Sequence, residues 1–306
     1  MSETTERSRA RSMEEMHHKM GSMFGGQAPT GEAAEPYRPL PTDVIITPFA
    51  KCGTTWLQQM FHTLRTRGDC DYDDISRVVP WIEMSPLLGI PLNAPQRGLP
   101  RGFKSHLSYT DVPKGARYIV AMRDPRDALV SMYRFMEGWF MEPGAIDIGT
   151  FARADFMNPE SRAYWRHLAS WWDQREEENV LMLSYEGMKA DQEATIRRVA
   201  RFAGIELDDE LLAITLENSS LAFMQANKDK FDDLMMREMS EKNAGLPPGS
   251  ESSKVRDGKT GSHVDVLGPE LLAELDAIWQ EEIAAKYGFA DYAAMEKALR
   301  DSMAGA

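Results

Sequence analysis

Residues 43–64 read DVIITPFAKCGTTWLQQMFHTL, and this stretch decides which fold the sequence predicts. The β-branched run at 44–47 ends at Pro48, which is typical of a short buried strand. After a loop that contains Gly53, apolar residues recur at helical spacing and form one face of a helix; they are Trp56, Leu57, Met60, Phe61 and Leu64. The stretch therefore predicts a strand, a glycine-containing loop and a helix, in that order.

The same order recurs further along the chain. Residues 117–122 predict a strand, and Asp124 and Pro125 suit the N-cap and first position of a helix that ends near residue 137. We expect further strands at 102–106 and 179–184 and further helices at 161–175, 192–203, 210–216, 269–287 and 292–299. Strands that alternate with helices indicate a single α/β domain with a central parallel β-sheet flanked by helices.

Composition sets the expected limits of this domain and its surroundings. Residues 1–36 are rich in Gly, Ser, Glu and Pro and predict a mobile N-terminal extension with a helical turn or two around 13–20, so the domain spans 37–306. The net charge of −13 argues against nucleic acid or an anionic membrane as partner. Two cysteines, no apolar run long enough to span a bilayer and a charged N-terminus favour a cytoplasmic protein.

The loop between the first strand and helix has the composition of an anion site. A helix N-terminus after a strand directs backbone N–H groups at a bound anion, and here Lys51 adds a charge while Thr54 and Thr55 add hydroxyl donors. The order differs from the usual nucleotide P-loop, in which the lysine follows the last glycine. Cys52 is interpreted as a small residue in a serine-like position, because nothing nearby in the sequence would hold a thiolate.

Residues 51–56 (KCGTTW) closely resemble the 5′-phosphosulfate loop of the cytosolic sulfotransferases. The resemblance implies that this loop binds the cofactor through Lys51, Cys52, Gly53, Thr54, Thr55 and Trp56. Residues 120–131 (VAMRDPRDALVS) resemble the 3′-phosphate segment of that family, where the resemblance implies that Arg123 and Ser131 bind the phosphate. The implied fold is the P-loop NTPase-like sulfotransferase fold, and the implied co-substrate is 3′-phosphoadenosine 5′-phosphosulfate (PAPS), with the bisphosphate PAP as product. We do not find the family's dimerisation signature, so the sequence predicts no oligomeric state.

A third segment, residues 103–107 (FKSHL), resembles the family stretch that carries the catalytic base. The resemblance implies that His106 accepts the proton of the attacking hydroxyl, a role suited to a group that titrates near neutral pH. Lys104 lies two residues earlier on the predicted strand and so on the same side of the sheet. Lys51, Lys104 and the loop amides would neutralise charge on the departing oxygen, and no metal is expected.

Weaker similarities extend the implied nucleotide site. They assign Trp56, Tyr185 and Ser219 to the adenine, and Leu221 occupies a position where the family has an aromatic residue. Residues 256–261 (RDGKTG) resemble a loop that completes the 3′-phosphate site through its arginine and amides, here Arg256, Asp257 and Gly258. Asp257 replaces a lysine and His263 a tryptophan, so these departures predict weaker cofactor binding.

Together the motifs predict a PAPS-dependent sulfotransferase that acts on a small molecule. Methionine clusters at 132–141 and 235–239, with Trp81, Trp139 and Phe140, hint at an apolar site for a lipophilic alcohol or phenol, although core packing explains them equally well. Two alternatives are a P-loop small-molecule kinase and a non-catalytic nucleotide-binding protein. The kinase needs a Mg²⁺ site with a strand-end aspartate, for which Asp124 is the nearest candidate.

Overall fold

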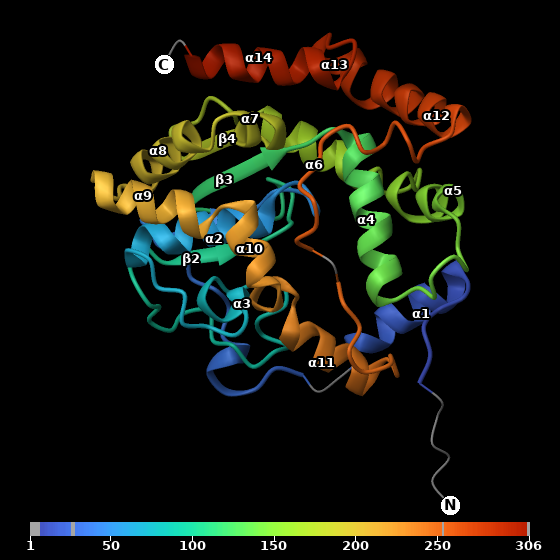
Figure 1. Cartoon of the computed structure of the whole chain (residues 1–306), viewed down its shortest axis with the longest axis horizontal. Helices are drawn as coiled ribbons and strands as arrows, with labels where there is room; N and C mark the ends of the chain where they lie inside the picture. The colour runs from blue at the N-terminus through green and yellow to red at the C-terminus, as the bar shows by residue number, and fades with distance from the viewer. Residues whose placement is uncertain (1–6, 26–27, 253, 305–306) are drawn as a thin grey trace, which may run out of the picture.

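A computed structural model describes residues 7–25, 28–252 and 254–304 (Figure 1). Within these ranges four parallel strands form one sheet in the order β2-β1-β3-β4. The strands are β1 (Val44–Ile46), β2 (Gly102–Lys104), β3 (Arg117–Met122) and β4 (Val180–Ser184). In the centre of the sheet Ile45 pairs with Phe103 on one side and Tyr118 on the other. The α/β fold with a central parallel sheet is therefore confirmed.

Helices cover both faces of the sheet because alternate strand residues point to opposite sides. Ile46 and Ile119 pack against α2 (Thr54–Thr66), α8 (Gln192–Ala203) and α9 (Asp209–Asn218) on one face. Phe103 and Tyr118 pack with Trp171 of α6 (Ala163–Trp172) on the other face. The buried apolar core thus fixes the ends of the strands in space.

The remaining helices lie around these two layers. They are α1 (Met13–Met23), α3 (Ile75–Val78), α4 (Pro125–Trp139), α5 (Ile148–Phe151), α7 (Tyr185–Ala190), α10 (Leu221–Ala226), α11 (Leu234–Asn243), α12 (Pro269–Trp279), α13 (Ala285–Tyr287) and α14 (Tyr292–Ala304). Short 3₁₀ turns occupy Gly31–Ala34 and Lys228–Phe231, and π-helical turns occupy Ala152–Phe156 and Gln280–Ala284. The predicted 269–287 helix thus comprises α12, a π turn and α13.

The start of α4 follows from its sequence. The side chain of Asp124 accepts a hydrogen bond from the amide of Arg126, and Pro125 occupies the first turn, where its missing N–H costs nothing. This arrangement ends β3 and begins α4 within three residues. It therefore fixes Arg123 at the carboxyl end of the sheet.

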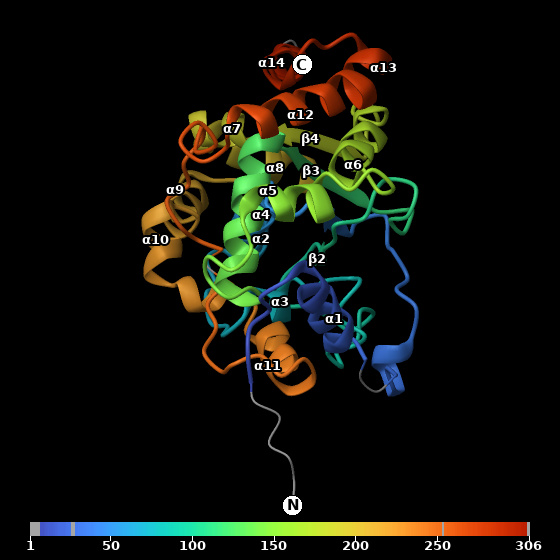
Figure 2. The ribbon, with the colours of Figure 1, turned by 90° about the vertical axis from the view of Figure 1, so that its right-hand side faces the viewer.

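The N-terminal segment differs from the predicted mobile extension over its described part. Residues 7–25 contain α1, which lies beside α11 at the end of the molecule opposite α14 (Figures 1 and 2). The amide of Ala10 donates to the carbonyl of Phe140 at 2.8 Å, and Met16 and Met23 are buried. The physical reason is that methionines recur on one face of α1, so the helix removes apolar surface from water when this face packs against the domain. Residues 1–6 and 26–27 lie outside the described residues.

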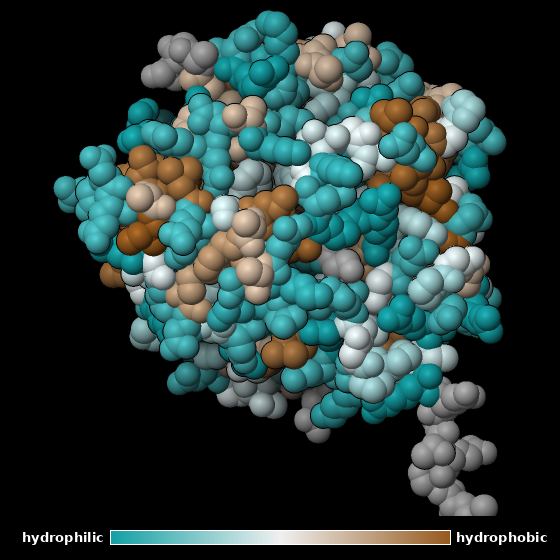
Figure 3. Space-filling view, viewed as in Figure 1, coloured by the Kyte–Doolittle hydropathy of each residue, from teal (hydrophilic) through white to brown (hydrophobic). Residues whose placement is uncertain are grey.

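The outer surface is polar over the face seen in Figure 3, with hydrophobic groups in scattered patches. One exposed hydrophobic side chain is Leu221, which is 43% exposed on α10. In the part of the chain that the structure describes, no helix combines the length and apolar character needed to cross a bilayer.

Candidate active site

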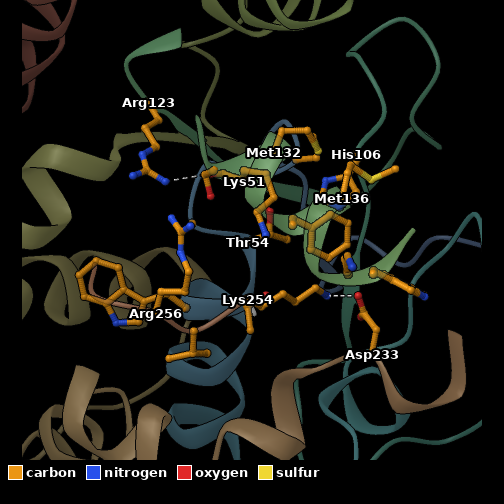
Figure 4. A pocket seen from close by; sticks show the side chains of 18 of the residues that line it. Lys51, Thr54, His106, Arg123, Met132, Met136, Asp233, Lys254 and Arg256 are labelled. Atoms are coloured by element: carbon orange, nitrogen blue, oxygen red, sulfur yellow. Dashed lines mark hydrogen bonds and ion pairs between the residues drawn. The ribbon is translucent and has the colours of Figure 1, made fainter. Parts of the chain in front are cut away.

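The carboxyl ends of all four strands meet at one cavity, as expected for ligand sites in open α/β sheets. Its volume is about 320 Å³, and its lining includes Lys51 after β1, Lys104 and His106 at the end of β2, Arg123 after β3 and Tyr185 after β4 (Figure 4). The sheet therefore brings together residues that lie far apart in the sequence.

The loop after β1 has an unusual backbone shape. Lys51 and Gly53 both have positive φ angles, of 70° and 95°. A Cβ atom on Gly53 would lie 3.2 Å from the ring of Tyr185, so glycine lets this loop approach the end of β4 closely. Thr54 begins α2, and its hydroxyl is buried without a hydrogen-bond partner in the described structure. A buried hydroxyl without a partner is a candidate to form a hydrogen bond with a bound ligand.

Arg123 connects two loops of the cavity. Its guanidinium donates to the carbonyl of Lys51 at 3.0 Å and to the carbonyl of Lys259 at 3.1 Å, and it lies 4.2 Å over the ring of Tyr185. Its Nε and the Nη1 of Arg256 are buried and have no partner among the residues described. Two charged donors are thus available for an anion beside the loop, and Ser131 lines the same region.

Aromatic groups line the neighbouring end of the cavity. Trp56 lies edge-on to Tyr185, with ring centroids 5.9 Å apart, and its indole donates to the carbonyl of Ser219 at 2.8 Å. The Ser219 hydroxyl accepts a hydrogen bond from the side chain of Gln192 and donates to its own helix. Leu221 and Gly258 also line this end, and Asp257 accepts a hydrogen bond from the Lys259 amide, which shapes the loop.

Cys52 requires a correction, because the sequence assigned it to the cofactor site. Its side chain is fully buried in the hydrophobic core and is not among the residues that line the cavity. Its backbone amide donates to the carbonyl of Phe49 at 3.1 Å. The loop turns this residue inward between the left-handed residues Lys51 and Gly53, so we remove Cys52 from the nucleotide contacts.

His106 is held in one tautomer by the end of β1. Its Nδ1 lies 2.8 Å from the carbonyl of Pro48, and because a carbonyl can only accept, Nδ1 carries the proton and Nε2 is left as an acceptor. Its amide donates to Glu83 at 2.8 Å. Burial, followed by the charge of Lys104, lowers the pKa of His106 well below its ordinary value. The imidazole is therefore neutral near pH 7 and able to take a proton.

Two lysines lie at the centre of the cavity. Burial lowers the pKa of Lys104 to about 8, and the charge of Lys254 lowers it in the same direction. The Lys104 ammonium lies 3.7 Å from the ring centroid of Trp81. Burial also lowers the pKa of Lys51 well below its ordinary value, with Lys254 next in importance. An anionic ligand in the cavity would therefore favour the charged form of both lysines.

Sequence reasoning missed Lys254 and Asp233, which form a buried ion pair in the cavity wall. Asp233 is the N-cap residue of α11 and Lys254 lies in the loop before Arg256, so only the tertiary structure brings them together. Lys254 lies two residues before the RDGKTG motif, which was the available signal. Asp233 had none, because it lies in a polar segment without periodicity.

The other end of the cavity is apolar. Its lining includes three residues of the N-terminal segment, Met20, Met23 and Phe24, together with Trp81, Met132, Phe135, Met136, Trp139, Phe140 and Met236. Several residues of the predicted methionine clusters are among them, whereas Met141, Met235 and Met239 are not. Apolar and aromatic lining of this kind suits a small lipophilic ligand.

Over the described ranges, no three His, Cys, Asp or Glu side chains are grouped so that they could hold a metal ion. Asp124, the nearest candidate for a magnesium ligand, instead caps α4 and pairs with Arg126 at 2.5 Å.

The sequence of the chain matches a known protein family and several of its members. The family model described as "Sulfotransferase domain" matches residues 41–287. Rat sulfotransferase 1 family member D1 is 30% identical over 230 residues, covering 71% of this chain and 77% of the relative. Human sulfotransferase 2A1 is 29% identical over 265 residues, covering 79% and 84%.

Solved structures share the fold at lower identity. Retinol dehydratase in a complex with retinol and PAP matches with a TM-score of 0.64 at 20% identity, covering 82% of this chain and 84% of that one. Mouse sulfotransferase SULT7A1 complexed with PAP matches with a TM-score of 0.60 at 18% identity, covering 97% and 95%. Since the family model spans most of the chain, this protein belongs to the sulfotransferase family.

Proposed function

We propose that the protein transfers a sulfuryl group from PAPS to a hydroxyl of a small, lipophilic alcohol or phenol, with His106 as the general base. The observation that carries this proposal is that three features meet in one cavity: anion donors without partners among the described residues, a neutral histidine whose Nε2 is available as an acceptor, and an apolar chamber. Two free cysteines suit a reducing compartment, and we place the enzyme in the cytoplasm.

The donors fit an adenosine bisphosphate. The regions after β1 and β3 contribute Thr54 and Arg123 to the cavity, and the loop before α12 contributes Arg256. Each of the three has a buried donor without a partner among the described residues. Trp56 and Tyr185 offer aromatic surface for the base. The PAP complexes of retinol dehydratase and of mouse SULT7A1 support this choice of nucleotide.

Bound PAPS would supply a sulfuryl group attached to a phosphate that leaves with the nucleotide. On the protein side, Nε2 of His106 takes the proton of the acceptor hydroxyl, and Nδ1 remains fixed on Pro48. Lys51 and Lys104 hold the negative charge that grows on the departing oxygen, and burial strengthens this attraction. The apolar chamber excludes water from the competing hydrolysis.

His106→Ala tests the proposal directly. Removal of the base should lower kcat with PAPS and a phenol by about 10³-fold, within the range known for general bases, while PAP affinity measured by calorimetry stays nearly constant. The matched control is His18→Ala, since His18 is exposed on α1 away from the cavity. Turnover that survives in His106→Ala at the level of the control would contradict the base assignment.

The same assay separates the two alternatives. A small-molecule kinase would use ATP in place of PAPS and would lose activity on addition of EDTA. A non-catalytic protein would bind PAP and give no product with any hydroxylated compound. We expect PAPS-dependent product that resists EDTA.

A further inference from the structure

The proposed mechanism makes no use of the ion pair between Asp233 and Lys254. The two side chains are 3% and 10% exposed, and both line the cavity that holds His106 and Lys104 (Figure 4). Burying an ion pair carries a desolvation cost that its own attraction does not always offset. A pair in this position is therefore a candidate for a role in ligand binding.

The side chain of Asp233 does not cap the helix that this residue precedes. It is the N-cap residue of α11, where an aspartate usually accepts a hydrogen bond from the helix, but its side chain makes no such bond. Instead Asp74, the N-cap residue of α3, accepts a hydrogen bond from the amide of Met235 at 3.2 Å. Asp233 also has a positive φ of 52°. Its carboxylate is thus turned away from its helix and toward Lys254.

Only one of the two carboxylate oxygens is used. Oδ2 pairs with Lys254, whereas Oδ1 is buried without a hydrogen-bond partner among the described residues. An ionised carboxylate is negatively charged and can only accept hydrogen bonds. It therefore repels the phosphates and the sulfuryl group of the nucleotide, which are also negatively charged acceptors. The spare oxygen therefore suits a donor on the acceptor molecule.

The surrounding charges determine which donor fits. Lys254 already neutralises Asp233, and the charges of Lys104 and Lys51 also act on this carboxylate. An additional ammonium group would meet three lysines around a single aspartate. A neutral hydroxyl avoids this repulsion and still satisfies the oxygen.

We propose that Oδ1 of Asp233 accepts a hydrogen bond from a second hydroxyl of the acceptor, so that preferred substrates are diols or hydroxyalkyl phenols. This inference rests on the proposed function, because His106 must bind the reacting hydroxyl. The rest of the acceptor contacts the methionines and aromatic residues of the chamber. Asp233 is a specificity-determining residue in this arrangement.

The test compares three series of phenols that differ only at the far end. They are 4-(hydroxyalkyl)phenols with one to four methylenes, 4-alkylphenols with methyl in place of the hydroxyl, and the corresponding amines. Binding to the PAP-loaded protein is measured by calorimetry. We expect at least one hydroxyalkyl phenol to bind about tenfold more tightly than its methyl and amino counterparts, as a hydrogen bond to a charged group allows. Equal or weaker binding at every chain length, or no binding by the hydroxyalkyl series, would overturn the inference.

Sulfate transfer from PAPS, measured on the same compounds, distinguishes this inference from the proposed function. A binding preference without transfer to any phenol would contradict the proposed function and leave the polar subsite standing. Transfer with equal binding of the hydroxyl and methyl series would contradict the subsite alone.

Variants assign the preference to the pair. In Asp233→Asn combined with Lys254→Met, which leaves no buried charge unpaired, the ratio of hydroxyl to methyl affinity should fall, because a hydrogen bond to a neutral amide oxygen is weaker than one to a carboxylate. Asp233→Asn alone keeps the shape of the side chain and should lower the ratio in the same direction. The matched control is Asp232→Asn, since Asp232 is also buried but pairs with Ser252 and Arg237 outside the cavity. A ratio that persists in both Asp233 variants would overturn the assignment.

Discussion

The two ends of the cavity are built in different ways. The end proposed to hold the nucleotide, here called the nucleotide end, has its main donors in short contiguous motifs around Lys51, Arg123 and Arg256. The first two of these motifs follow strands β1 and β3. The apolar end combines α1, α4 and α11 with Trp81, so its lining comes from segments that are distant in the sequence. His106 lies where the two ends meet.

This difference follows from the kind of ligand that each end is proposed to hold. A bisphosphate needs charged donors at fixed positions, and the ends of a buried parallel sheet provide fixed positions. A lipophilic acceptor needs shape and apolar area, which flexible methionines on separate helices can supply. Substitutions at the two ends should therefore change different binding constants.

The largest effect on binding is expected at the nucleotide end. Arg123→Met removes a buried charged donor, which should weaken PAP binding by roughly 100-fold and leave the relative affinity for different acceptors unchanged. Arg123→Lys should give an intermediate loss, because lysine keeps the charge but cannot form the two-pronged contact of arginine. Calorimetry at one salt concentration measures both.

The control for Arg123 is the nearby Arg126→Met. Arg126 is partly exposed, pairs with Asp124 and does not line the cavity. Because Arg123 also holds the carbonyls of Lys51 and Lys259, thermal unfolding is recorded for each variant. If a folded Arg123→Met protein binds PAP as well as the Arg126 control does, Arg123 does not bind the nucleotide and the proposed difference between the two ends is contradicted.

A smaller, pH-dependent effect is expected where the ends meet. The base must be neutral, and burial with the charge of Lys104 lowers the pKa of His106 below 6.5, so kcat/KM should fall only below that pH. Lys104 must be charged, and its pKa of about 8 means that kcat/KM for PAPS declines as the pH rises past that value. Beyond each limit the change is about tenfold per pH unit.

A pH profile of kcat/KM for PAPS measures both limbs. Lys104→Arg should extend the alkaline limb to higher pH, because arginine keeps its charge there. An acidic limb at or above pH 6.5 would contradict the role given to His106.

The sequence predicted the sheet well because its strands and caps depend on local patterns, and the motif residues Lys51, Arg123 and Arg256 do line one cavity. The strands at 44–46 and 117–122 and the caps of α4 follow from β-branched runs and from Asp124 and Pro125. The inward orientation of Cys52 could not be predicted, since it depends on the φ angles of its two neighbours. Nor could the pairing of Asp233 with Lys254, which only the packing of α11 against a distant loop creates.

The N-terminal segment gives the smallest expected effect and tests whether α1 belongs to the acceptor end. Met20 lines the cavity from α1, outside the matched family domain at 41–287. Met20→Ala should raise the KM for a lipophilic phenol by about threefold and leave PAP affinity unchanged. The effect is small because a partly exposed methionine contributes less apolar contact to binding than a buried one. Met13→Ala is the control, because Met13 lies on the same helix but does not line the cavity. If both variants change the phenol KM equally, α1 acts only through the stability of the fold; a change in PAP affinity with Met20→Ala alone would show that α1 reaches the nucleotide end.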